Sequence, residues 1–106
     1  MAKYLIAASY SAEGLRGLAK DKASGRKKAI EKAVASVGGK VGAVYYALGE
    51  WDVYVVADFP DNLAAASMAI AVSSTGMVRT QTTPLFTVEE ADHLFDKSVT
   101  YRPPGA

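Results

Sequence analysis

The amino-acid sequence predicts an α+β domain whose elements follow the ferredoxin-like order β-α-β-β-α-β, with a four-stranded antiparallel sheet. The chain has 106 residues, which is the length of one ordinary domain. Four short apolar runs alternate with segments that have helical periodicity or alanine-rich composition. The second and third runs follow each other across a short glycine-bearing segment, which is typical of an antiparallel hairpin. We therefore expect a single domain that spans residues 1–106.

The four predicted strands are residues 3–10, 41–48, 51–59 and 77–86. The first run is too short for a signal peptide, so we interpret it as a strand. Gly49-Glu50 predicts a tight turn between the second and third strands. Because proline has no N–H group to donate, Pro84 marks the fourth strand as an edge strand or marks its end.

The first helical segment starts at Ser11, a good N-cap residue. The run from Asp21 to Gly25 interrupts the apolar pattern, so we expect two helical pieces, with Ser24 as the cap of the second. The apolar face of the second piece is Ile30, Ala33, Val34 and Val37. Gly38-Gly39 is expected to end it, because glycine readily adopts the left-handed conformation of a helix C-terminus.

Two further helices are predicted. Asp61 or Asn62 caps an alanine-rich helix that ends near Ser74. Thr87 and Glu90 have the spacing of a capping box, which predicts a last short helix over residues 88–97. Residues 98–106 form an extended C-terminal tail that contains two adjacent prolines.

Composition excludes several classes of function. The formal net charge is +1, which argues against nucleic acid as a partner. The chain has no cysteine and one histidine, so no metal centre of Cys or several His ligands is expected within one subunit. No apolar stretch approaches the ~20 residues of a membrane helix, so no membrane partner is expected. The expected location is the cytoplasm.

Alternation along the strands predicts that both faces of the sheet are apolar. On the hairpin, Val41, Ala43, Tyr45 and Ala47 are expected on one face and Val44, Tyr46 and Leu48 on the other. Helices cover only one face in this fold, and an exposed apolar face of this size would attract another surface. We therefore expect a homodimer or a higher homo-oligomer. The alternative is that the terminal helix and tail cover the second face.

The segment Leu48-Gly49-Glu50-Trp51-Asp52-Val53 resembles the Gly-x-Tyr-Asp signature of the GYD-domain family, with Trp51 in place of the tyrosine. Lys3-Tyr4-Leu5-Ile6, Ser24-Gly25-Arg26-Lys27 and Ser98 to Gly105 also look like that family. The resemblance implies a ferredoxin-like, dimeric α/β-barrel type fold and no established reaction. The hairpin is also similar to one in the effector-binding domains of leucine-responsive regulators, where it lies near intersubunit ligand sites.

The hairpin supplies the candidate ligand-binding residues, which are Gly49, Trp51, Asp52 and Tyr54. The Asp52 carboxylate suits an ammonium or hydroxyl group, and Trp51 offers an apolar wall. A structural role for Asp52, as an acceptor for backbone amides in the turn, is the favoured interpretation.

Arg79 and His93 are weak candidates for catalysis. His93 has Asp92 and Asp96 nearby, so it has the partners of a general base. No cofactor is predicted, although haem with His93 as its ligand remains an alternative. The basic run Arg26-Lys27-Lys28 is interpreted as a solvated helix face. An anion site at Ser24-Gly25 is the sharper interpretation.

Two hypotheses for function follow. The first is a non-catalytic, oligomeric module that binds a small metabolite. The second is a small enzyme of the dimeric α/β-barrel type, such as a cofactor-independent oxygenase, an isomerase or a haem-using enzyme, in which Arg79, Tyr54, Asp52 and His93 would do the chemistry.

Overall fold

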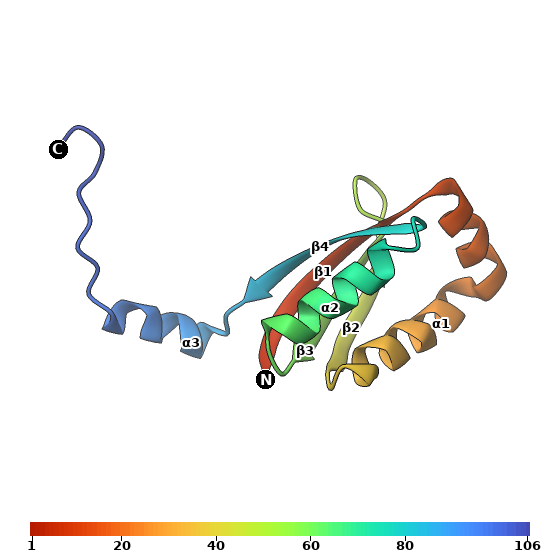
Figure 1. Ribbon diagram of the computed structural model, residues 1–106, viewed down its shortest axis with the longest axis horizontal. Coiled ribbons are helices and arrows are strands. Elements are labelled where there is room, and N and C mark those ends of the chain that lie inside the picture. The colour runs from red at the N-terminus through yellow and green to blue at the C-terminus, as the bar shows by residue number, and fades with distance from the viewer.

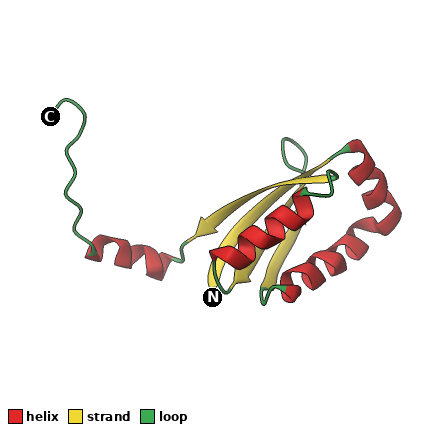
Figure 2. Cartoon of the chain, in the orientation of Figure 1, coloured by secondary structure: helices red, strands yellow, loops and turns green.

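The computed structural model describes residues 1–106, and its elements follow the predicted order (Figures 1 and 2). The elements are β1 (Ala2–Tyr10), α1 (Ala12–Ser36), β2 (Lys40–Tyr46), β3 (Val53–Phe59), α2 (Asn62–Ser73), β4 (Val78–Leu85), α3 (Val88–His93) and a 3-10 turn, η1 (Leu94–Asp96). The strands form one sheet in the order β2-β3-β1-β4, and every neighbouring pair is antiparallel. This is the ferredoxin-like α+β fold. β4 is an edge strand and Pro84 is its penultimate residue, in agreement with the prediction of an edge or a strand end.

Helix starts are set by local capping, as expected from sequence. The Ser11 hydroxyl accepts a hydrogen bond from the amide of Gly14 at 3.0 Å. Asp61 caps α2 by accepting from the amide of Ala64 at 2.8 Å. Thr87 and Glu90 form the predicted capping box of α3. No helix combines the length and apolar character needed to cross a membrane.

α1 is bent where the sequence pattern is interrupted. Lys22 has φ 66° and ψ 166°, which breaks the helix into two pieces. Residues other than glycine rarely adopt these backbone angles. Holding such a residue there costs about 1–3 kcal/mol. The break lies two residues before Ser24, the residue expected to cap the second piece. Gly38 ends the helix with φ 81°, as predicted.

The core lies between the helices and one face of the sheet. Nine buried residues form it, with fully buried Val34 from α1 and Phe59 from β3 at its centre. Tyr4 packs edge-on against Phe59, with ring centroids 5.5 Å apart. α2 contributes Ala65 as its single buried residue. The core is therefore concentrated at one end of the two helices.

The hairpin differs from the prediction in two ways. The expected tight turn at Gly49-Glu50 is instead a loop over residues 47–52, closed by a 2.8 Å hydrogen bond from the Ala47 amide to the Asp52 carbonyl. Trp51 and Leu48 therefore lie in the loop and not in strands. In addition, the register shifts between Val41 and Ala43, which is a β-bulge at Gly42.

The bulge changes which side chains share a face of β2. Val41 pairs with Ala57 and packs on the core with Val44, whereas Ala43 and Tyr45 pair with Val56 and Tyr54. The prediction that Val41 and Ala43 share a face is wrong, because one extra residue reverses the alternation.

The C-terminal arm, residues 86–106, extends away from the domain (Figures 1 and 2). It does not cover the second face of the sheet, so the alternative to oligomerisation is not realised within one chain. Its apolar side chains are exposed: Phe86, Val88, Leu94, Phe95, Val99 and Tyr101. The arm raises the radius of gyration to 16.7 Å, against about 13 Å for a folded chain of this length.

Two glycines of α1 give a matched test of packing. A Cβ at Gly14 would overlap the carbonyl oxygen of Met77, while a Cβ at Gly17 would meet nothing within 4 Å. We predict that Gly14→Ala lowers the free energy of unfolding by about 1–3 kcal/mol through overpacking. Gly17→Ala should raise it by up to about 1 kcal/mol, because alanine favours the helix. Urea unfolding measures both, and equal effects of the two substitutions would contradict the close approach at Gly14.

Candidate functional site

The hairpin loop is tied to the central strand by Asp52. Its carboxylate accepts a hydrogen bond from the backbone amide of Tyr10 at 2.8 Å, and its own amide donates to the Ala8 carbonyl at 2.8 Å. Gly49 lies in the exposed part of the loop with φ 134°, a conformation that glycine adopts readily. Asp52 therefore fixes where β1 ends and β3 begins, and its carboxylate bonds the amide of a neighbouring strand.

The open face of the sheet carries Tyr54 and Arg79. We define it by the side chains that point away from the helices. Its apolar centre is Leu5, Ala7, Ala43, Tyr45, Tyr54 and Val56. Arg79 lies on the edge strand β4, opposite Ser9, and is exposed. An ion pair between Lys3 and Asp58, at 3.0 Å, borders this centre.

His93 lies apart from the other candidates. It is on α3, in the arm, where its Nδ1 lies 2.8 Å from the carboxylate of Asp96. The side chain of His93 is 74% exposed and that of Asp96 is 70% exposed. The sheet and the hairpin hold Asp52, Tyr54 and Arg79, so one subunit does not bring all four proposed catalytic residues together (Figure 1).

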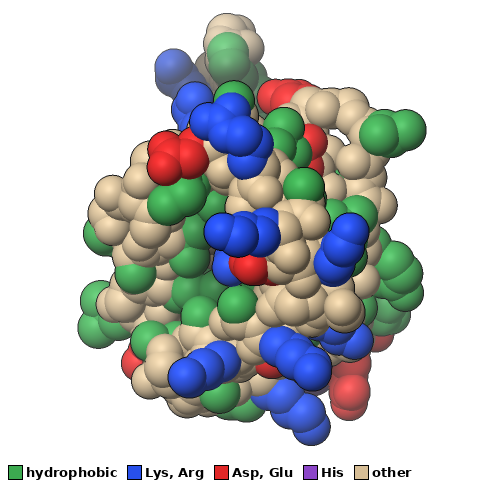
Figure 3. All heavy atoms as spheres, turned by 90° about the vertical axis from the view of Figure 1, so that its right-hand side faces the viewer, with side chains coloured by type: hydrophobic (Ala, Val, Ile, Leu, Met, Phe, Trp, Pro, Cys, Tyr) green, Lys and Arg blue, Asp and Glu red, His purple; other side chains and the backbone are tan.

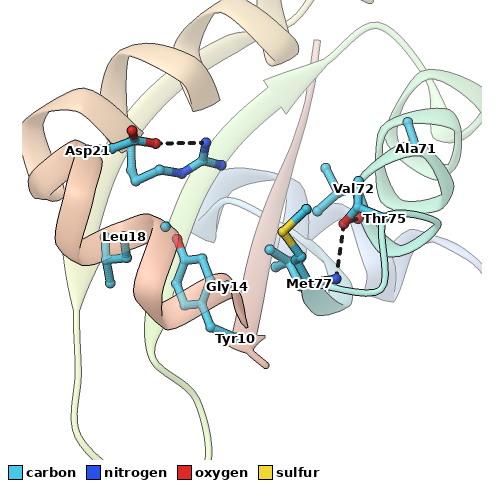
Figure 4. A pocket seen from close by; sticks show the side chains of 11 residues that line it. Tyr10, Gly14, Leu18, Asp21, Ala71, Val72, Thr75 and Met77 are labelled. Carbon is cyan, nitrogen blue, oxygen red and sulfur yellow. Dashed lines mark hydrogen bonds and ion pairs between the residues drawn. The ribbon is translucent and has the colours of Figure 1, made fainter. Parts of the chain in front are cut away.

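A cleft between α1 and α2 is the largest cavity of the molecule. Its outer lobe has a volume of about 450 Å³. In Figure 4, Tyr10, Gly14, Leu18 and Asp21 form one side, and Ala71, Val72, Thr75 and Met77 form the other. Small residues at the start of α1 and the end of α2 leave this space, because they do not reach across to fill it. The size is in the range of small-molecule sites, about 300–1,000 Å³.

The cleft continues inward toward the sheet as a smaller lobe of about 70 Å³. The two lobes share Tyr10, Arg26, Val72 and Val78. Apolar side chains from the sheet and both helices line most of the inner lobe, among them Ile6, Ile30, Val55 and Met68. Arg26 is the only charged residue of the inner lobe. The cleft is thus apolar inside, with a cation at the junction of its lobes.

Arg26 has one ion-pair partner in the protein. Its Nη1 lies 3.9 Å from the Asp21 carboxylate, across the break in α1 (dashed in Figure 4). Its Nε is buried, and no protein group accepts its hydrogen. A donor buried without an acceptor costs about 1–3 kcal/mol, and more in a charged group. Arg26 is therefore incompletely satisfied by the protein around it.

Tyr46 stands beside this charge. Burial of its hydroxyl, followed by the neighbouring Tyr10, raises the pKa of Tyr46, and the nearby Arg26 partly offsets this rise. The raised pKa reinforces the neutral form of the phenol, which can donate a hydrogen bond. Its hydroxyl approaches the Ala23 carbonyl at 3.5 Å.

The sequence predicts Arg26 on a solvated helix face together with Lys27 and Lys28, and for Arg26 this prediction is wrong, because it lines the cleft. Helical spacing distinguishes Arg26 from the two exposed lysines that follow it. Arg26 precedes Ile30 by four residues and Ala33 by seven, so it shares their apolar face. Lys27 and Lys28 are exposed, as expected. The cleft itself had no sequence signal, because it depends on the break at Lys22 and on the distance between two helices.

The family model of the GYD domain matches residues 4–95 of the chain. The match covers the sheet, α1, α2 and the first part of the arm. No curated protein and no solved structure matches the chain.

The role of Asp52 can be measured. We predict that Asp52→Ala lowers the free energy of unfolding by about 1–3 kcal/mol, because the Tyr10 amide loses its acceptor. Asp52→Asn keeps an acceptor oxygen and should cost less. Glu50→Ala, in the exposed part of the same loop, is the matched control and should be neutral. Urea unfolding followed by the fluorescence of Trp51 measures the three variants. Amide exchange should become faster at Tyr10 in Asp52→Ala only. An Asp52→Ala protein with wild-type stability and a protected Tyr10 amide would contradict the structural role.

Proposed function

The chain belongs to the GYD-domain family, and we propose that it works as a homodimeric, non-catalytic module that binds a small metabolite between α1 and α2. The observation that carries the proposal is the cleft: an apolar cavity of ligand size with one incompletely satisfied cation inside it. A large apolar cavity with a few polar groups is the usual form of a small-molecule site.

Binding without chemistry is the simpler function for this arrangement. The cleft contains Asp21 and Arg26 as its charged side chains, and they lie close to each other. Neither faces a serine, histidine or second carboxylate across the cleft, so no nucleophile and base form a pair there. Arg79, Asp52 and Tyr54 belong to the sheet and hairpin, outside the lining of the cleft.

Exposed surface supports assembly into a dimer. The chain exposes 7566 Å², whereas a compact protein of 11.2 kDa exposes about 5,700 Å². The excess of about 1,900 Å² is more than the ~800 Å² per partner of a standard interface. Much of it belongs to the arm, and the apolar centre of the open face remains uncovered as well, with Tyr45 exposed to 70%.

The open face is a better interface than the sheet edges. The edge strand β2 carries the bulge at Gly42, and the edge strand β4 contains Pro84. Both features oppose strand addition at an edge. Two open faces packed about a twofold axis would bury the apolar centres, and each arm would then lie along the partner subunit.

The dimer has a direct test. We predict that the wild-type protein sediments as a dimer in analytical ultracentrifugation, and that Tyr45→Lys dissociates it. Lysine would place a charge among the apolar side chains of the buried open face. Phe95→Asp should weaken the dimer by at least tenfold, because Phe95 is 87% exposed on the arm. Leu63→Lys is the matched control, since Leu63 is 78% exposed on the helical side and should leave the dimer intact. A wild-type monomer at tens of micromolar, or equal dissociation by Leu63→Lys, would refute this interface.

The location of the ligand site has a separate test. We predict that thermal unfolding in the presence of a metabolite panel identifies compounds that stabilise the wild-type protein saturably. Gly17→Phe should abolish this stabilisation, because position 17 opens into the outer lobe and has free space around it. Tyr54→Phe and Arg79→Ala, on the open face, should not. If Tyr54→Phe and Arg79→Ala abolish the stabilisation and Gly17→Phe does not, the ligand site is on the open face. If no compound stabilises the wild-type protein, the binding function is contradicted.

A further inference from the structure

Arg26 decides which class of molecule suits the cleft. It lines both lobes, so its guanidinium can reach a ligand that occupies either one. Guanidinium carries five N–H donors in a planar fork, which suits the two oxygens of a carboxylate. The protein does not satisfy all of these donors, since the buried Nε has no protein acceptor; the Nη groups are the ones that would meet a ligand. The ion pair with Asp21, at 3.9 Å, is longer than a hydrogen bond and leaves the remaining donors free for a second acceptor.

The surrounding charge favours an anion. α1 carries seven Lys and Arg residues and three acidic residues, a formal charge of +4 in a chain whose total is +1. Figure 3 views the end of the molecule that α1 forms, where basic side chains outnumber acidic ones and a hollow with hydrophobic side chains opens beside them. Such a field attracts anions to the cleft.

The charged side chains of the cleft itself favour an anion with a single negative charge. Arg26 is the only cation among the residues that line the cleft, and Asp21 lies next to it. A phosphate monoester carries about −1.5 to −2 charges and normally needs several cations. A carboxylate is satisfied by one guanidinium, and the Tyr10 ring, which lines both lobes, adds an aromatic wall.

The rest of the cleft selects an apolar body. Leu18, Val72 and Met77 line the outer lobe, and Ile30 and Met68 line the inner one. Burying an apolar group against them contributes about 25 cal/mol per Å² of its surface. Methionine adjusts its shape easily, so Met68 and Met77 can fit either a chain or a ring.

We propose that the cleft binds a small monocarboxylate with an aliphatic or aromatic body, with the carboxylate on Arg26 and the body between α1 and α2. This assignment rests on the proposed binding function and adds the chemical class of its ligand.

The test compares acids with uncharged and cationic analogues of the same shape. The probes are hexanoate and phenylacetate, their primary amides, hexylamine, and phenyl phosphate. Binding is followed on the 106-residue chain by the amide NMR shifts of Gly17 and Val72, which lie on opposite walls of the cleft. We expect each acid to bind at least tenfold more tightly than its amide, and to bind more tightly than phenyl phosphate or the amine.

Three variants identify the role of Arg26. Arg26→Gln should weaken the binding of the acids at least tenfold and leave the affinity for the amides unchanged. Arg26→Lys should retain part of the affinity for the acids. Arg16→Gln removes an exposed charge of the same helix and should have no effect. If Arg26→Gln does not fold, the comparison of Arg26→Lys with Arg16→Gln gives the same information.

Each outcome is decisive. Amides or the amine binding in the cleft as tightly as the acids would overturn the carboxylate assignment and leave the binding function standing. Tighter binding of phenyl phosphate would overturn it in the same way. Equal weakening by Arg16→Gln and Arg26→Gln would show general attraction to α1 and would also overturn it. If the acids bind without changing the amide NMR shifts of Gly17 and Val72, the cleft is not their binding site. If no probe binds and the metabolite panel also gives no stabilisation, the proposed function itself fails.

Discussion

β1 is apolar on both of its faces and hydrogen-bonded on both of its edges, so the fold depends on what covers each face. On one side, Tyr4, Ile6 and Ala8 pack beneath the helices. On the other side, Leu5 and Ala7 lie on the open face, and no element of the same chain crosses it (Figure 1). A strand of this kind needs two covering layers. The helices supply the first, and the surface of a second copy supplies the other in the proposed dimer.

The helical layer itself is incomplete, which creates the cleft. Val34 and Phe59 close the core at one end, where the end of α1 meets the sheet. At the other end the break at Lys22 turns the first piece of α1 away from the second, and small residues face α2. Strained backbone persists where the surrounding structure holds it, and it concentrates at functional sites. The proposed site therefore occupies the part of the fold that packs least well, while the core lies at the other end.

Much of this fold follows from local sequence signals. The caps at Ser11, Asp61 and Thr87 and the helix end at Gly38 need only side chains and backbone within a few residues, and all four are present. The bulge at Gly42 was beyond such reasoning, since a glycine between apolar residues does not reveal an extra residue in the pairing. The break at Lys22 was located only approximately. Its residue is a lysine, which gives no indication of a conformation that glycine usually occupies.

The candidate site was predicted less well, for a physical reason that Asp52 illustrates. From the sequence, Asp52 is expected to bind a ligand or to accept from the amides of its own turn. Its carboxylate instead bonds the amide of Tyr10, 42 residues away in the chain. Tyr10 lines both lobes of the cleft and stands beside the raised-pKa phenol of Tyr46. The aspartate of the family signature is therefore connected to the cleft through one hydrogen bond and one strand end. It acts by fixing the position of the residue that forms the wall. A residue named in a signature need not line the candidate site itself, because it can serve by holding the backbone of a residue that does.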